Sequence, residues 1–269
     1  MELLKGFLFQ LVSTVGIVAL FGLIIALLRR AFCAIAPKNG PRILLITGIV
    51  GTPIHELSHA LMCLIFGHKI TEIKLYEPNS GDGTLGHVSH SYNRKNIYHQ
   101  IGNFFIGTAP VVLGGAVTVL FMALLTPSSF DTVMSEVEEL SFVDISTVPI
   151  AEYLEYIGHI ISAVFSLDAL SSLEGWLFVL LAIMISSHME MSGSDIKNSS
   201  LGFVFLAILL LVADTVIYFV SPELLDAING ATVSVGLILS AILSISVLFL
   251  LALLLLGLIF KGIASIFRK

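Results

Sequence analysis

Charged residues are scarce in this chain of 269 residues. Only 12% of the residues are charged and 57% are hydrophobic, whereas a soluble globular domain carries about 25% charged residues. The formal net charge is −6, and no basic tract indicates a nucleic-acid partner. These proportions exclude an ordinary soluble enzyme. They predict a polytopic protein of the lipid bilayer, whose helices satisfy their own backbone hydrogen bonds.

Cysteine is equally scarce, with only Cys33 and Cys63 in the chain. The two residues lie on either side of half a membrane helix, so we expect no disulfide between them. Cys63 follows His59 by four residues and could share its helical face. We predict that Cys63 is a small buried apolar residue, with an approach to a metal as the alternative.

The sequence shows no internal repeat and no second soluble domain. Its apolar runs predict an all-α membrane protein of about six transmembrane helices, with a small β-hairpin or sheet after the second helix. We divide the chain into a first helix with a basic linker (1–42), a membrane core (43–220) and a C-terminal helix (221–269). The six spans lie near residues 7–28, 43–66, 101–125, 173–187, 201–220 and 233–260.

Lysine and arginine are absent from the acidic segment 126–172. Because basic residues prefer the cytoplasmic side, we expect this segment outside, and the segment 68–100 and the C-terminus inside. The direction of the first span stays open. A second span that crosses fully puts the basic linker outside, as its length permits, whereas a re-entrant second span puts the linker inside, as its charge favours. Within the acidic segment, Glu155 and His159 lie on the polar face of an expected amphipathic helix. The expected location is the cytoplasmic (plasma) membrane, with several passes.

The polar stretch between the second and third spans resembles a hairpin. Residues 70–76 alternate imperfectly between apolar and polar, residues 79–83 are a dense turn signal, and residues 84–92 can form the returning strand. An edge strand of such a hairpin can bind an extended peptide through its main chain. An ordinary loop is the alternative.

The second span carries the motif His55-Glu56-Leu57-Ser58-His59. Residues four apart share a helical face, so the two imidazoles can hold Zn²⁺ while Glu56 takes a proton from a water on the metal. The alternative is a helix whose polar residues only form hydrogen bonds. Thr52 and Pro53 resemble an N-cap and a first helical residue, so we expect the helix to restart there.

A catalytic zinc site usually needs a third protein ligand. Asp195 is the best candidate, because it lies at a small-residue break between two spans; a helix-capping role is its alternative. His188, on the same side of the membrane, could be a ligand, a donor to the substrate oxyanion or a residue without a role. Asn103 could also donate to the oxyanion, orient a substrate backbone, or only cap its helix. The other candidate ligands are Asp168, Asp214, His68, His87, His90 and His99.

Together these residues resemble the site-2 protease family of intramembrane zinc metalloproteases (peptidase family M50-like). The resemblance rests on the motif in a membrane helix, the hairpin-like segment, the helix with Asn103, and an aspartate at a later helix break. It implies that His55, His59 and Asp195 bind zinc and that Glu56 is the general base. The family's aspartate usually stands in a Leu-Asp-Gly context, where this chain has Ser194-Asp195-Ile196.

The resemblance makes residues 43–220 a metalloprotease-like core. We therefore predict an intramembrane zinc metalloprotease with Zn²⁺ as cofactor, a zinc-bound water activated by Glu56, and a peptide or transmembrane segment as substrate. The first alternative is a metal-binding membrane protein without proteolytic activity, such as an immunity or regulatory factor. A transporter is the second alternative, which inverted repeats would favour.

Overall fold

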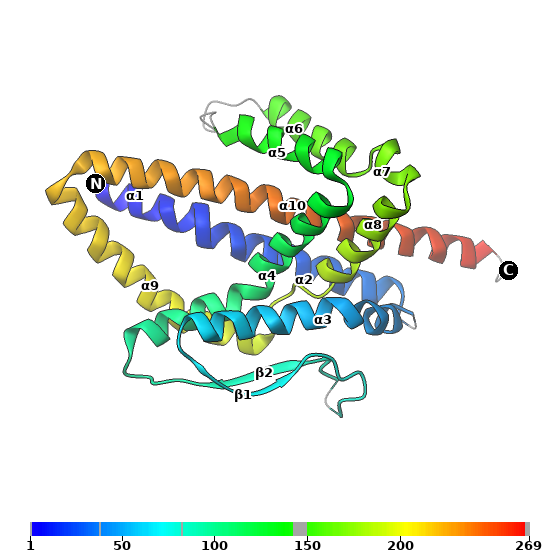
Figure 1. The fold of residues 1–269 in the computed structure, drawn as a ribbon, viewed down its shortest axis with the longest axis horizontal. Coiled ribbons are helices and arrows are strands. Elements are labelled where there is room, and N and C mark those ends of the chain that lie inside the picture. The colour runs from blue at the N-terminus through cyan, green and yellow to red at the C-terminus, as the bar shows by residue number, and fades with distance from the viewer. Residues whose placement is uncertain (1, 38, 82, 142–149, 267–269) are drawn as a thin grey trace.

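The protein is described by a computed structural model that covers residues 2–37, 39–81, 83–141 and 150–266 (Figure 1). It is mostly helical, with one small sheet, as the composition predicted. The chain begins with α1 (Glu2–Leu11), a π-helical turn (Val12–Gly16), α2 (Ile17–Ile35), α3 (Gly40–Ile65), β1 (Lys69–Lys74) and β2 (His87–Ser91). It continues with α4 (Ile97–Leu125), α5 (Pro127–Ser141), α6 (Ile150–Val164), α7 (Leu167–Ser171), α8 (Leu173–Ser186), α9 (Gly193–Val220) and α10 (Pro222–Ile266).

Within the described residues, four helices are long and apolar enough to cross a membrane: Leu3–Ile35, Ile97–Leu125, Gly193–Val220 and Pro222–Ile263. The other two predicted spans are helices that fall short by this measure, so the count of about six is not confirmed. α8 has 14 residues, whereas a span needs about 20. α3 is long enough, but its polar residues, including His55, Glu56 and His59, lower its hydropathy.

α4 lies at the centre of the helical bundle and packs against α3, α8, α9 and α10. One apolar core, which includes Met122, Phe178 and Phe249, joins α4, α5, α6, α8 and α10. A second core, which includes Ile25 and Ile185, joins α2, α4, α8 and α10. Val50 and Ile54 of α3 pack against the second core, which thus holds the end of α8 beside α3.

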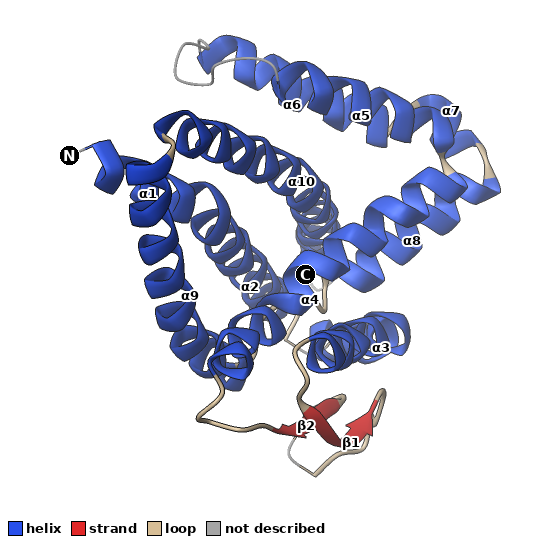
Figure 2. Ribbon diagram, turned by 60° about the vertical axis from the view of Figure 1, so that its left-hand side comes forward, coloured by secondary structure: helices blue, strands red, loops and turns tan. Residues whose placement is uncertain are grey.

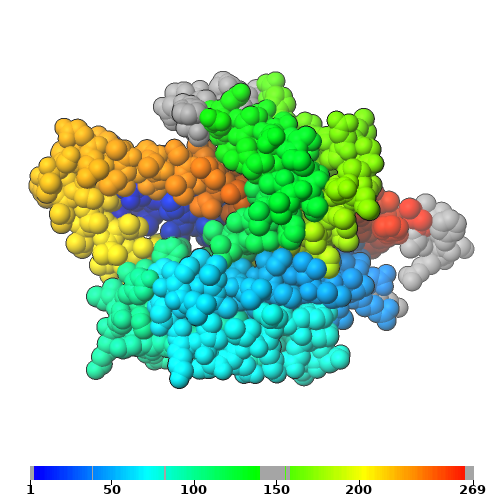
Figure 3. Space-filling model, viewed as in Figure 1, coloured from blue at the N-terminus to red at the C-terminus, as the bar shows by residue number. Residues whose placement is uncertain are grey.

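The predicted hairpin is present, as an antiparallel pair of strands with Ile73 opposite Val88 and an irregularity between Ile70 and Glu72. It lies along α3, on the side away from α10 (Figures 1 and 2). In the space-filling view the hairpin and its connecting loop form a layer against α3 (Figure 3). The Tyr76 hydroxyl in that loop donates to the Leu45 carbonyl of α3 at 2.6 Å, which fixes the layer to the helix.

The acidic segment forms α5, α6 and α7, at the opposite end of α4 from the hairpin (Figure 1); its residues 142–149 lie outside the described residues. The Glu136 carboxylate and the His159 ring join α5 to α6 at 3.1 Å. Val133, Ile160 and Val164 are buried in the first apolar core, while Glu155 and His159 are exposed. Among the described side chains of α6, Glu155 and His159 thus lie on the exposed side, and Ile160 and Val164 pack against the bundle.

The prediction that the second helix restarts at Thr52 is wrong. α3 runs without a break from Gly40 to Ile65, through Pro53. Gly51 permits a close approach to α8 at this point. A Cβ at Gly51 would collide with the Met184 carbonyl oxygen and lie 2.6 Å from His188 Cδ2. The close approach brings the residues after α8 to the motif helix.

Gly51→Ala should therefore destabilise the protein, because the added methyl group has no space between α3 and α8. Overpacking of this kind costs about 1–3 kcal/mol. A Cβ at Gly230, inside α10, would meet nothing within 4 Å, so Gly230→Ala is the matched control and should slightly stabilise its helix. Thermal unfolding in detergent, followed by circular dichroism, measures both; equal melting temperatures for Gly51→Ala and the wild type would contradict the close packing.

Candidate metal centre

α3 presents the two histidines of the motif one turn apart. The Nε2 atoms of His55 and His59 face one another at 3.1 Å, with the two rings edge to face. His59 is buried, at 6% exposure. The helical spacing therefore brings two potential metal donors to one point inside the protein.

Backbone carbonyls fix the orientation of both rings. Nδ1 of His55 donates to the His188 carbonyl at 2.6 Å, and Nδ1 of His59 donates to the Ile106 carbonyl at 2.8 Å. Because a carbonyl oxygen only accepts, each neutral ring carries its proton on Nδ1 and leaves Nε2 bare. Two bare nitrogens at 3.1 Å repel each other unless a cation lies between them. Metal-binding histidines commonly show this arrangement, in which the second ring nitrogen donates to a carbonyl.

Asp195 completes a group of three donors. Its Oδ1 lies 3.5 Å from His59 Nε2, and one donor atom from each of His55, His59 and Asp195 lies within 4.8 Å of the others. Zinc–nitrogen bonds of about 2.0–2.1 Å in a tetrahedral site imply donor separations of about 3.3 Å. The three side chains thus fit a small divalent cation.

The second oxygen of Asp195 has a structural role. Oδ2 accepts the Ser192 backbone N–H at 2.8 Å, and the Ser192 hydroxyl accepts the Asp195 N–H at 3.2 Å, which is a capping box at the start of α9. The two readings of Asp195 from the sequence are therefore compatible: one oxygen caps the helix and the other faces the histidines.

The start of α9 reaches the histidines because α4 has a glycine at the crossing point. A Cβ at Gly107 would lie 2.5 Å from the Asp195 carbonyl oxygen and 2.8 Å from Ser199 Cβ. The neighbouring residue, Ile106, supplies the carbonyl that orients His59. The same part of α4 thus sets both the position of Asp195 and the ring of His59.

Glu56 lies next to this group. It is buried, at 6% exposure, and lines two cavities together with His55, one of about 350 Å³ and one of about 230 Å³. Gly86, just before β2, closes over it: a Cβ at Gly86 would lie 3.0 Å from Glu56 Cγ. A carboxylate beside two imidazoles in a confined space is suited to proton transfer.

Residues 17–89 match the family model described as Peptidase M50B-like. The matched segment runs from α2 to β2 and contains His55, Glu56 and His59, while Asp195 lies beyond it. The match agrees with the resemblance to site-2 proteases and indicates a protease. Together with the four long apolar helices, it makes this an integral membrane protein. Comparisons with curated proteins and with solved structures found no match.

His188 contacts the M50B-like segment with its ring as well as its backbone. Its Nε2 lies 3.0 Å from the Thr47 hydroxyl, and its Nδ1 lies 3.4 Å from the Thr52 hydroxyl. The group of three donors includes Asp195 and not His188. The structure therefore places His188 as a neighbour that orients His55 through its carbonyl and lines the 350 Å³ cavity with its ring.

The other residues proposed from the sequence have different surroundings. Asn103 is 1% exposed, and neither the nitrogen nor the oxygen of its side-chain amide has a hydrogen-bond partner among the described residues. Asn103 is not one of the described residues that line the two cavities. Asp168 lies in the first turn of α7. Asp214 is buried, and its Oδ1 accepts from Gln10 Nε2 at 3.4 Å, so its partner is a glutamine of α1. His87 lines the 230 Å³ cavity and lies 3.5 Å from Glu72.

His68, His90 and His99 form a separate group beyond the motif. Burial is the main cause that lowers the pKa of His90 to about 4, with His68 and His59 contributing, and burial also lowers the pKa of His68. Both rings are thus neutral at pH 7. His90 also lines the 230 Å³ cavity, together with His59 and Asp195.

An ion pair between Arg29 and Glu190 was not foreseen from the sequence. Both side chains line the 350 Å³ cavity beside His55, Glu56 and His188. The sequence offered only an indirect signal, namely that Glu190 follows His188 by two residues and that Arg29 lies at the end of the first apolar run. The pair puts a guanidinium within the cavity that contains Glu56.

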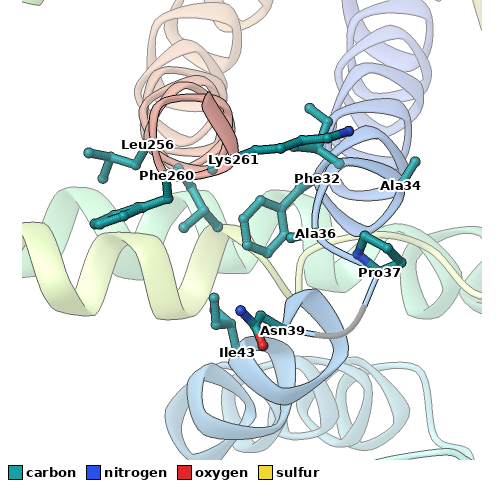
Figure 4. A pocket seen from close by; sticks show the side chains of 12 residues that line it. Phe32, Ala34, Ala36, Pro37, Asn39, Ile43, Leu256, Phe260 and Lys261 are labelled. Atoms are coloured by element: carbon teal, nitrogen blue, oxygen red, sulfur yellow. The ribbon is translucent and has the colours of Figure 1, made fainter. Parts of the chain in front are cut away.

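A further cavity, of about 640 Å³, lies between the ends of α2 and α10 and the start of α3 (Figure 4). Its lining is mainly apolar and includes Phe32, Ile43 and Phe260; Asn39 and Lys261 are its polar side chains. It contains none of the side chains of the donor group, so we assign it no part in the chemistry.

The two roles of Asp195 can be separated by substitution. Asp195→Asn should weaken zinc binding by more than the roughly 10–100-fold that follows loss of an outer partner of a metal ligand. Ser192→Ala is the matched control, since it removes the cap, at a cost of about 1 kcal/mol, but leaves the carboxylate. Metal titration of both purified variants measures their zinc affinities. An unchanged zinc affinity in Asp195→Asn would exclude Asp195 as a ligand.

Proposed function

We propose that this chain is an intramembrane zinc metalloprotease that hydrolyses peptide bonds of membrane-embedded or membrane-proximal substrates. One observation carries the proposal: the bare Nε2 atoms of His55 and His59 and an oxygen of Asp195 converge within 4.8 Å, beside the buried Glu56. Two imidazoles and a carboxylate are a donor set typical of catalytic zinc, which keeps a further position open.

His55, His59 and Asp195 would hold the ion. When bound, zinc lowers the pKa of a water to about 7 and polarises a carbonyl group. The three donors come from the motif helix and the start of α9, so closing the site requires both elements in place. The carbonyls of His188 and Ile106 keep both rings in the ligating tautomer.

Glu56 acts as the general base in this proposal. It lies one residue from His55 and lines both cavities with it, so a water bound beside the donor group can lie next to its carboxylate. Glu56 takes a proton from the attacking water and later gives it to the leaving amine. General acid–base catalysis of this kind contributes about 10²–10⁴-fold to the rate.

The developing oxyanion needs a hydrogen-bond donor. The sequence offered His188 and Asn103 for this role, and of the two only His188 lines the cavity with Glu56. We therefore assign the role to His188. Its two ring nitrogens lie 3.0 and 3.4 Å from the hydroxyl groups of Thr47 and Thr52, so its single N–H must leave a hydroxyl group to donate to the oxyanion.

The substrate class follows from the hairpin. His87, Val88 and His90 of β2 line the 230 Å³ cavity together with Glu56. A peptide paired with the hairpin through its main chain would lie extended along this wall. A helical transmembrane segment must unwind first, because its backbone groups are already bonded within the helix.

Glu56→Gln should abolish cleavage of a membrane-anchored peptide, a loss of about 10²–10⁴-fold, while zinc stays bound. Glu174→Gln, an exposed residue at the start of α8, is the control and should keep full activity. Cleavage in detergent or liposomes and metal content by mass spectrometry give the two readouts. Full activity in Glu56→Gln would exclude it as the base, and an inactive wild type with bound zinc would favour a metal-binding protein without proteolytic activity.

A further inference from the structure

A second group of metal-ligating side chains lies one helical turn beyond the motif. Donor atoms of Cys63, His68 and His90 all lie within 4.8 Å of one another. Cys63 is in the last turn of α3 and fully buried, His68 precedes β1 and is 3% exposed, and His90 is in β2. Cys63 and His68 are close because the His68 N–H donates to the Cys63 carbonyl at 2.8 Å in the turn that ends α3, whereas His90 reaches them from β2 through the fold.

The ring of His68 is held in one tautomer. Its Nε2 donates to the His99 carbonyl at 3.0 Å, which leaves Nδ1 bare, and Tyr92 stacks on the ring with centroids 4.7 Å apart. The bare Nδ1 faces His90 Nδ1 at 3.0 Å. His68 thus has the feature that also marks His55 and His59, a second nitrogen donating to a backbone carbonyl.

His99 does not add a fourth donor. The Asn93 backbone N–H donates to His99 Nδ1 at 3.2 Å, so a neutral His99 ring carries its own proton on Nε2 and has no free lone pair. A hydrogen bond between His68 and His90 would by itself explain why these two of the three side chains lie close together. It does not involve the thiol of Cys63, which lies within 4.8 Å of a donor atom of each ring.

We propose that Cys63, His68 and His90 bind a second Zn²⁺ ion. One thiolate and two neutral imidazoles are ligands that zinc prefers, at about 2.3 Å for sulfur and 2.0–2.1 Å for nitrogen. The observed N···N distance of 3.0 Å is close to the roughly 3.3 Å that a tetrahedral site implies. On binding, the S–H bond of Cys63 breaks, the sulfur electrons form the bond to zinc, and the proton passes to solvent.

The second ion would join the hairpin to the motif helix. Cys63 belongs to the helix that carries His59, while His90 belongs to the strand that lines the 230 Å³ cavity. Binding would therefore fix β2 relative to His59 and Asp195. This site shares no metal ligand with the proposed catalytic centre, although His90 also lines the 230 Å³ cavity beside it, and it stands whether or not the chain is a protease.

Cobalt substitution distinguishes the two sites, because only the second contains sulfur. The full chain, purified in detergent and loaded with Co²⁺, should bind two ions and show a thiolate-to-cobalt charge-transfer absorption. Cys63→Ser should lose this absorption and one ion, whereas Cys33→Ser, which alters the chain's other cysteine, should keep both. The double variant His55→Ala/His59→Ala should lose one ion and keep the absorption.

The proposal is overturned if loaded wild-type protein lacks the thiolate absorption, or if Cys63→Ser leaves it unchanged. Because Cys63 is fully buried, circular dichroism checks that each variant is folded. Should Cys63→Ser unfold, His90→Ala decides the matter, since loss of a nitrogen ligand must weaken cobalt binding at this site or shift the absorption. An unaltered spectrum and stoichiometry in folded His90→Ala would also overturn the site.

Discussion

The repulsion between two bare imidazole nitrogens, held 3.1 Å apart inside the protein, is the constraint on which this structure depends. Neither ring can turn away without breaking its bond to a carbonyl, that of His188 for His55 and that of Ile106 for His59. A cation between the nitrogens turns this repulsion into attraction, and Asp195 adds a negative charge at 3.5 Å from His59. The site thus combines two neutral donors with one anionic donor, and the buried Glu56 lies beside them.

The helices are arranged around this point by close approaches. Gly51 leaves space on α3 for the end of α8, which brings the His188 carbonyl close to His55. Gly107 leaves space on α4 for the first turn of α9, which brings Asp195 close to His59. The capping box of Ser192 fixes that turn, so the Asp195 carboxylate belongs to a helix start and not to a loop. On the other side the hairpin closes over Glu56 through Gly86, which gives a confined cavity with one wall made of strand β2.

Much of this could be predicted from local patterns. The period of the helix puts His55 and His59 on one face, and the cluster of turn residues at 79–83 predicts the hairpin. Asp195 could be singled out by its place at a helix break, although only the structure shows that its two oxygens do different things. The helix start predicted at Thr52 and Pro53 is wrong, because a proline lacks only one backbone donor and α3 continues through it. The role of the His188 carbonyl, the Arg29–Glu190 pair across 161 positions and the meeting of Cys63 with His90 depend on tertiary contacts that no spacing encodes.

Anomalous diffraction at the zinc edge, from crystals of zinc-loaded Glu56→Gln protein, tests the central claim most directly. A peak is expected at about 2.0–2.1 Å from Nε2 of both His55 and His59 and about 2.0–2.2 Å from a carboxylate oxygen of Asp195. A zinc-saturated protein without density at this point, in which the two imidazoles instead share a proton, would contradict it.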